Sequence, residues 1–310
     1  MTSFQGSAVR RNGGASNRTA RQPVLDDVER GIAAKLPILD ALTAARRIRA
    51  GAQPSPTAAN GLRLLAVGDS WFDHGADDLA DCLRRDADHA VSSLAVSGST
   101  LEQLAYGSLP QGHLGVRDAH RVSRVEDLVF ALEAYRPHAL LVSAGGNDLK
   151  GGAVSLLGSA LLSPGDLPRD EVRRYVADAF AQPYRDLVAL VAEKARRMNR
   201  PVPVVVQGYD YPRVSTRVAR FAEQFGGGSR ALMDSIGKIF IDAFDSVLSE
   251  LSAANPGAVY LADLRGTLTT AADWSDEIHP SAPGFARLAS KLDGVVRDAV
   301  SSARQPRTGG

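Results

Sequence analysis

Only one cysteine, Cys82, is present among the 310 residues of this sequence. An intrachain disulfide and a cysteine-based metal cluster are therefore excluded. Cys82 belongs to an apolar helical pattern with Leu79 and Leu83, which indicates a buried and unreactive thiol. We therefore expect the chemistry of this protein to depend on other side chains.

Long apolar runs and an excess of charge are also missing. No window has the roughly 18 uninterrupted apolar residues of a membrane helix, and no apolar run follows the N-terminal arginines as in a secretory signal. We therefore expect a cytoplasmic protein without a membrane span; export by a route that needs no such signal stays open. The 36 Lys and Arg residues nearly balance the 35 Asp and Glu residues, so no bulk field recruits nucleic acid.

Large apolar groups are scarce in residues 1–24, which contain four arginines and no acidic residue. This composition predicts a disordered basic arm, either solvated or in contact with an anionic partner. Residues 25–49 have apolar positions at three- and four-residue steps, so 25–60 is interpreted as a helix followed by a linker. We expect one domain over 61–303 and a disordered tail over 304–310. The oligomeric state is open.

Short apolar runs alternate with longer amphipathic patterns inside the predicted domain. The runs cover 62–67, 90–96, 139–143, 202–207 and 258–262, and the helical patterns cover 76–86, 123–135, 170–198, 229–253 and 282–300. Continuous apolar strands that alternate with helices indicate a parallel sheet covered on both faces. The sequence therefore predicts a three-layer α/β/α sandwich with a central, mostly parallel five-stranded sheet.

Polar motifs follow the first three predicted strands, where ligands gather at the carboxyl edge of such a sheet. Gly68-Asp69-Ser70 follows the first strand and places a hydroxyl on a sharp turn, although it also fits an ordinary turn or helix cap. Gly98, after the second strand, has an unobstructed backbone N–H, or simply precedes a helix. Asn147, after Gly145-Gly146 and the third strand, offers a neutral amide donor, or belongs to a plain turn.

A fourth motif, near the C-terminus, contains a histidine. Asp276 stands three residues before His279, and Pro280 follows, so a carboxylate can meet one edge of the imidazole and fix its tautomer. Asp273 is a second candidate for this carboxylate, if the loop folds differently. None of the six histidines has metal-ligand spacing to another, so no metal is expected.

The four motifs, taken together and in this order along the chain, resemble those of the SGNH hydrolases, also called GDSL esterases and lipases. The resemblance spans about 62–300 and implies a flavodoxin-like fold, hydrolysis of acyl esters and no cofactor. It implies that Ser70 is the nucleophile, His279 the base and Asp276 its acid. It also implies an oxyanion hole formed by Ser70, Gly98 and Asn147. Trp71 replaces the leucine usual after the serine, which suggests a branch with bulkier groups beside the nucleophile.

Four residues near these motifs are candidates for a substrate pocket: Trp71, His74, Tyr209 and Tyr211. His74 is alternatively a rim group, and the two tyrosines alternatively pack against a neighbouring loop. Asp69 and Asp148 are interpreted as braces of their turns. The apolar stretch 151–168 is a candidate lid.

The substrate is predicted to be a small-molecule or glycan ester, without a nucleic-acid or membrane partner. Hydrolysis of carbohydrate O-acetyl groups or of thioesters by the same residues is an alternative. A non-catalytic module that binds acyl or sugar ligands on the same fold is another alternative.

Overall fold

A computed structural model describes residues 61–106, 124–149, 169–213 and 230–305 of this chain. The predicted basic arm, the helix at 25–49, its linker, the candidate lid and most of the C-terminal tail lie outside the described residues. These expectations therefore stay predictions.

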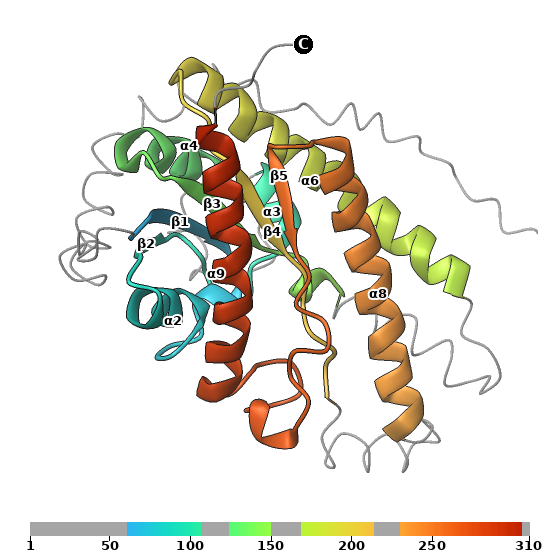
Figure 1. The fold of residues 1–310 in the computed structure, drawn as a ribbon. Helices are drawn as coiled ribbons and strands as arrows, with labels where there is room; N and C mark the ends of the chain where they lie inside the picture. The colour runs from blue at the N-terminus through green and yellow to red at the C-terminus, as the bar shows by residue number, and fades with distance from the viewer. Residues whose placement is uncertain (1–60, 107–123, 150–168, 214–229, 306–310) are drawn as a thin grey trace, which may run out of the picture.

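Five parallel strands form a single sheet with the order β2-β1-β3-β4-β5 (Figure 1). The strands are β1 (Arg63–Gly68), β2 (Ala90–Ser93), β3 (Ala139–Ser143), β4 (Val204–Gln207) and β5 (Val259–Ala262). All five residues of the central strand β3 are buried, as expected for a strand covered on both faces. In the register, Gly68 pairs with Ser143, so β1 and β3 end at the same level.

Helices cover both faces of this sheet (Figure 1). They are α2 (Leu79–Asp86), α3 (Leu101–Tyr106), α4 (Arg124–Tyr135), α6 (Arg169–Arg197), α8 (Arg230–Ala254) and α9 (Ala282–Arg304). Helix α2 packs beside α9, whereas α6 packs beside both α8 and α3. The predicted three-layer fold with five parallel strands is thus confirmed.

The second strand was predicted to be longer than it is. The sequence pattern continues to residue 96, but β2 ends at Ser93. The backbone N–H groups of Leu94 and Val96 still donate to Ala66 (2.8 Å) and Gly68 (3.0 Å). The chain therefore stays beside β1 past the end of the strand, which explains why its apolar pattern continues.

Helix α9 positions the loop that carries the histidine motif. The Ser281 hydroxyl caps the helix by accepting the Gly284 N–H at 3.3 Å. Phe285, Leu288 and Leu292 recur at three- and four-residue steps and are buried against the sheet. The loop before Ser281 is thereby held at the carboxyl edge of the strands.

Cys82 is fully buried in α2, and burial raises the pKa of its thiol above the usual value.

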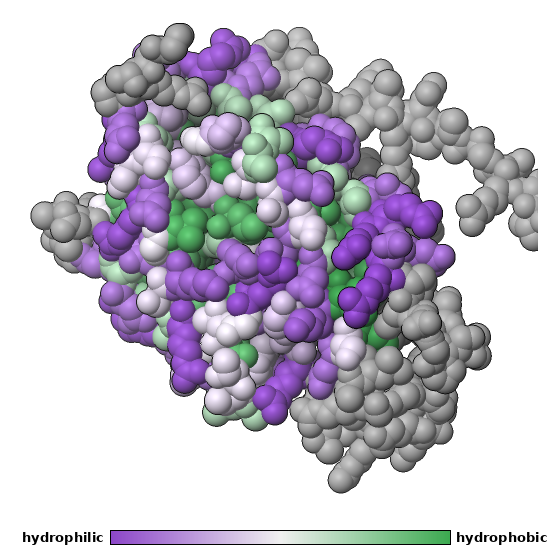
Figure 2. All heavy atoms as spheres, turned by 45° about the vertical axis from the view of Figure 1, so that its right-hand side comes forward, coloured by the Kyte–Doolittle hydropathy of each residue, from purple (hydrophilic) through white to green (hydrophobic). Residues whose placement is uncertain are grey.

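No helix within the described ranges is long and apolar enough to cross a membrane. On the face shown in Figure 2, hydrophilic and hydrophobic residues are interspersed.

Candidate active site

The turn after β1 brings Ser70 to the carboxyl edge of the sheet. Gly68 has a φ of +132°, and a Cβ atom there would lie 1.7 Å from the carbonyl oxygen of Ser143. Only glycine allows this close approach of β1 to β3. The Asp69 N–H donates to the same carbonyl at 2.8 Å, and the Asp69 carboxylate accepts the Trp71 N–H at 3.1 Å. Ser70 then begins a short 3-10 helix, η1 (Ser70–Phe72).

The histidine motif meets this turn although it lies 209 residues further along the chain. The Ser70 Oγ is 2.9 Å from Nε2 of His279. On the opposite edge of the ring, Nδ1 of His279 is 2.7 Å from Oδ2 of Asp276. The three side chains therefore form a continuous chain of hydrogen bonds in which the imidazole is held at both nitrogens.

Asp276 is bound to the loop as well as to the ring. Its Oδ1 accepts the backbone N–H groups of Ile278 (2.9 Å) and His279 (2.7 Å). Burial acts to raise the pKa of Asp276, but the hydrogen bonds from the His279 ring and the two N–H groups together lower the pKa below its usual value. Asp276 is therefore an ionised partner for the imidazole.

Asp273, the alternative acid, has a different set of partners. Its side chain is buried, and its Oδ2 accepts the Thr270 N–H at 2.8 Å, within the capping box of the 3-10 helix η2 (Ala271–Asp273). Its Oδ1 accepts a hydrogen bond from Arg287 at 2.5 Å. The structure thus places Asp276 against the ring of His279 and gives Asp273 a capping position.

Two of the three predicted oxyanion groups, Gly98 and Asn147, lie on adjoining loops. Gly98 is exposed and has a φ of +80°, and a Cβ atom there would meet no other group within 4 Å, so there is open space beside this residue. The Asn147 amide nitrogen donates one hydrogen to the carbonyl of Ser99 at 2.9 Å. The second hydrogen of that amide remains to be donated to a ligand. The Leu101 N–H donates to Asp148 at 3.0 Å and links the same two loops again.

Two of the four pocket candidates are buried beneath the site. Trp71 is 4% exposed and its indole N–H donates to the Ile278 carbonyl at 3.2 Å. Tyr209 is 5% exposed, lies edge-on to Trp71 at 4.9 Å between ring centroids, and donates its hydroxyl hydrogen to Asp69. Both rings pack under neighbouring loops, and their polar atoms hydrogen-bond to the Ile278 carbonyl and to the buried Asp69 carboxylate. For Tyr209 this packing is one of the two alternatives that the sequence left open, and a role of either ring in a substrate pocket stays a prediction.

His74 is exposed and its ring stacks on that of His279. The ring centroids are 4.0 Å apart and the ring planes differ by 18°. Burial and the neighbouring His279 lower the pKa of His74, while Asp276 opposes the shift. His74 therefore covers one face of the imidazole that Ser70 and Asp276 hold at its edges.

Tyr211 lines a hollow of about 300 Å³ beside the histidine loop. The other lining residues are Pro212, Arg213, Asp234, Leu268 and Trp274. The Arg213 N–H donates to the carbonyl of Glu277 at 3.0 Å, so the hollow adjoins the loop of His279. Tyr211 is the one pocket candidate that lines this hollow.

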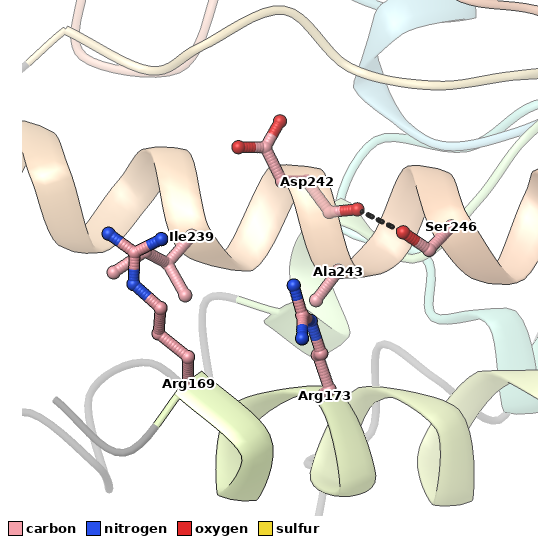
Figure 3. Close-up of a pocket in the computed structure, with 6 residues that line it drawn as sticks. All are labelled: Arg169, Arg173, Ile239, Asp242, Ala243 and Ser246. Atoms are coloured by element: carbon pink, nitrogen blue, oxygen red, sulfur yellow. Dashed lines mark hydrogen bonds between the residues drawn. The ribbon is translucent and has the colours of Figure 1, made fainter.

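A second, smaller cavity of about 70 Å³ lies between α6 and α8. Figure 3 shows that Arg169 and Arg173 extend from α6 toward α8, which carries Asp242 and Ser246. None of the residues that line this cavity belongs to the chain of hydrogen bonds from Ser70 to Asp276.

Within the described ranges, no group of three or more His, Cys, Asp and Glu side chains is arranged to hold a metal ion.

No sequence pattern pointed to Ser143 as part of the site. Its hydroxyl donates to Asp69 at 2.9 Å, and both groups are buried. A polar residue that ends an otherwise apolar strand, directly before Ala144-Gly145-Gly146, is the only signal in the sequence.

Comparison with known proteins assigns the family. The pattern that defines the GDSL-like lipase/acylhydrolase family matches residues 61–292. A comparison with curated proteins gave no match. Solved structures that resemble this chain include the lipase Lip_vut3 from a goat rumen metagenome, with 14% identity, a TM-score of 0.48 and coverage of 76% of this chain and 97% of that chain.

Two further similar structures are those of a Veillonella parvula member of the lipolytic G-D-S-L family and a Clostridium thermocellum family 3 carbohydrate esterase. The first has 13% identity, a TM-score of 0.45 and coverage of 75% of this chain and 97% of that chain. The second has 14% identity, a TM-score of 0.41 and coverage of 78% and 98%. The family match spans most of the chain, including every motif at the sheet edge. The chain therefore belongs to the GDSL-like lipase/acylhydrolase family, the SGNH hydrolases, and is an enzyme that hydrolyses ester bonds.

Proposed function

We propose that this enzyme hydrolyses carboxylic esters through an acyl-enzyme formed on Ser70. The observation that carries the proposal is the unbroken series of contacts from Ser70 Oγ to His279 Nε2 (2.9 Å) and from His279 Nδ1 to Asp276 (2.7 Å). A serine hydroxyl is a weak nucleophile until a base within hydrogen-bond reach removes its proton. Both distances lie within that reach.

In the first step, Ser70 Oγ attacks the ester carbonyl as its proton moves to Nε2 of His279. The ring becomes an imidazolium, and the Asp276 carboxylate stabilises that charge from the Nδ1 side. The lowered pKa of Asp276 keeps this carboxylate ionised at neutral pH. Asp276 therefore supports the charged ring without taking its proton.

The negative charge on the carbonyl oxygen needs donors that are already in place. We assign this role to the backbone N–H groups of Ser70 and Gly98 and to the Asn147 side-chain amide. The open space at Gly98 and the fixed amide of Asn147 support the assignment. Loss of one such donor typically lowers the rate by about 100- to 1,000-fold.

In the second half of the reaction, the imidazolium gives its proton to the departing alcohol and the carbonyl re-forms as an acyl-Ser70 ester. Water then enters, His279 takes a proton from it, and attack on the acyl group releases the acid and restores Ser70. Atoms and charge balance without any cofactor, because the same histidine accepts and returns one proton in each half.

An acetylated glycan is the second candidate substrate, alongside simple acyl esters. The hollow beside the histidine loop combines the rings of Tyr211 and Trp274 with the charged side chains of Arg213 and Asp234. Aromatic residues with a few polar groups are typical of small-molecule sites, and the polar groups can bind sugar hydroxyls, which an alkyl chain lacks. A panel of p-nitrophenyl esters, acyl thioesters and acetylated oligosaccharides separates these possibilities by their kcat/KM values.

Labelling with a fluorophosphonate tests the nucleophile. The probe reacts with activated serines, so we expect the wild-type protein and a Ser301→Ala control to be labelled and Ser70→Ala to remain unlabelled. Ser301 is an exposed serine on α9 and serves as the matched substitution. Labelling of Ser70→Ala at the wild-type rate would refute the assignment.

A further inference from the structure

The ends of three neighbouring strands are joined by one buried carboxylate. Asp69, after β1, is 2% exposed and accepts three hydrogen bonds. They come from the hydroxyl of Tyr209 after β4 (2.5 Å), from the hydroxyl of Ser143 at the end of β3 (2.9 Å) and from the Trp71 N–H (3.1 Å). Bracing the turn of Asp69 needs only the Trp71 bond, so the other two bonds require a different explanation.

Tyr209 has a second partner on the loop that carries Asn147. Its hydroxyl oxygen accepts the backbone N–H of Gly146 at 3.0 Å while its hydrogen goes to Asp69. A Cβ atom at Gly146 would lie 3.2 Å from that oxygen, so the loop backbone rests directly on the tyrosine. One buried hydroxyl therefore connects the turn of the nucleophile to the loop of the proposed oxyanion donor.

The hydrogen bonds from Tyr209 and Ser143 depend on the protonation state of Asp69, whose pKa is set mainly by its burial. Burial raises the pKa of Asp69 to about 6, against the lowering effect of the hydrogen bonds from Tyr209, Trp71 and Ser143. Asp148, beyond the same loop, raises the pKa further. Tyr184 of α6 also faces this region, and its hydroxyl donates to the carbonyl of Ala144 at 2.6 Å.

We propose that Asp69 and Tyr209 are positioning residues that hold Ser70 and Asn147 at a fixed separation, so that nucleophile and oxyanion donor act on the same carbonyl group. The proposal rests on the proposed function. Neither residue touches the substrate. Catalysis by preorganised donors tolerates little displacement, since a shift of about 1 Å in such a group lowers the rate by about 100-fold.

Tyr209→Phe removes both hydrogen bonds of the hydroxyl and retains the ring. Tyr135→Phe is the matched control, because the Tyr135 hydroxyl donates to the Ala90 carbonyl (2.7 Å) at the opposite edge of the sheet. With p-nitrophenyl acetate, we expect Tyr209→Phe to lower kcat by about 10- to 100-fold with KM within about twofold. We expect Tyr135→Phe to retain the wild-type kcat.

The pH profile provides a readout that a purely structural role would not move. The Tyr209 hydrogen bond lowers the pKa of Asp69, so its loss raises that pKa. In Tyr209→Phe, the decline of kcat on the acid side is therefore expected at higher pH than in the wild type. A wild-type kcat and an unmoved acid limb in this variant would overturn the proposal.

Fluorophosphonate labelling distinguishes failure of the positioning role from failure of the proposed function. Labelling of wild-type Ser70 with unchanged labelling of Tyr209→Phe overturns the positioning role alone, whereas absence of wild-type labelling overturns the proposed function and this inference with it. Should Tyr209→Phe not fold, Ser143→Ala decides, because it removes only one bond to Asp69. We expect about a 2- to 10-fold lower kcat in that variant, and an unchanged kcat contradicts the proposal.

Discussion

At the scale of single residues, two aspartates three positions apart have different partners. Asp276 contacts the imidazole of His279, whereas Asp273 caps the 3-10 helix η2 and binds Arg287. Spacing alone left both open, because either carboxylate can reach the ring if the loop changes course. The backbone N–H groups that donate to each carboxylate fix its position: those of Thr270 and its neighbour hold Asp273 away from the ring, and that of His279 holds Asp276 beside it.

These partners predict opposite effects for the two amide substitutions. Asp276→Asn removes the charge beside the imidazolium and is expected to lower kcat by about 1,000- to 10,000-fold while the Tm stays near that of the wild type. Asp273→Asn is expected to lower the free energy of unfolding by about 1–3 kcal/mol with kcat retained, because it weakens a buried acceptor. Steady-state kinetics and thermal unfolding of both variants check this; a large loss of kcat in Asp273→Asn alone would reverse the assignment.

Side-chain exposure is the residue-scale property that the sequence predicted least well. The positions of Ser70, Asn147 and His279 at one sheet edge follow from strands that end just before them or from the helix that begins just after. Trp71 and Tyr209 lie at the same edge, but their burial depends on contacts with segments far away in the sequence. The contact of Trp71 with Ile278 joins segments 207 residues apart, which no local pattern reveals.

At the scale of elements, the boundaries of long segments were predicted closely. Helices α4, α6 and α8 begin and end within about one residue of the predicted ranges, since their apolar stripes span several turns. Helix α3 was missed, because its six residues complete fewer than two turns and give no usable periodicity. This short helix nevertheless follows Gly98 and contacts Asp148 through the Leu101 N–H.

Two glycine substitutions test how the elements constrain the site. Gly68→Ala places a methyl group against the carbonyl of Ser143 at a φ of +132°, so we expect a loss of stability of more than about 3 kcal/mol or failure to fold. Gly294→Ala, in α9, meets no group within 4 Å and is expected to stabilise the protein by up to about 1 kcal/mol through helix propensity.

Urea unfolding of the two variants provides the measurement. The two substitutions add the same methyl group, so a difference in sign between them isolates the effect of backbone position. Equal stability of Gly68→Ala and the wild type would mean that the turn before Ser70 is not fixed by its contact with β3.

At the scale of the whole molecule, the alternation of apolar strands and amphipathic helices was sufficient to predict the layered fold. The connection of three strand ends through Asp69 was not predictable in the same way. It depends on the strand order β2-β1-β3-β4-β5, which brings β3 beside β1 although β2 follows β1 in the sequence. Local patterns indicate that a strand exists and do not specify its neighbours.

The dependence of stability on pH is another property of the whole molecule. At the amino ends of β1 and β3, away from the candidate active site, Nδ1 of His138 accepts the Arg63 N–H at 3.0 Å. Burial and the nearby arginines Arg63, Arg304 and Arg200 lower the pKa of His138 to about 4. The unfolded chain takes up this proton near pH 6.5, so the contribution of His138 to stability is complete above pH 6.5 and is lost as the pH falls toward 4.

His138→Asn retains an acceptor without the titrating group. Its free energy of unfolding is therefore expected to decline less than that of the wild type between pH 7 and pH 4.5, measured in urea. The difference between the two proteins is the relevant quantity, because the raised pKa values of Asp69, Asp78 and Asp245 act in the opposite direction. Parallel pH profiles for the two proteins would contradict this account.

The contact between Ser70 and His279 is the feature on which the proposed mechanism depends most. The most direct test is the kcat of Ser70→Ala on p-nitrophenyl acetate, with circular dichroism and Tm to establish that the variant is folded. We predict that kcat falls by at least about 10,000-fold in a protein as stable as the wild type, because no other group supplies the nucleophile. A folded Ser70→Ala variant with kcat within tenfold of the wild type would contradict the mechanism.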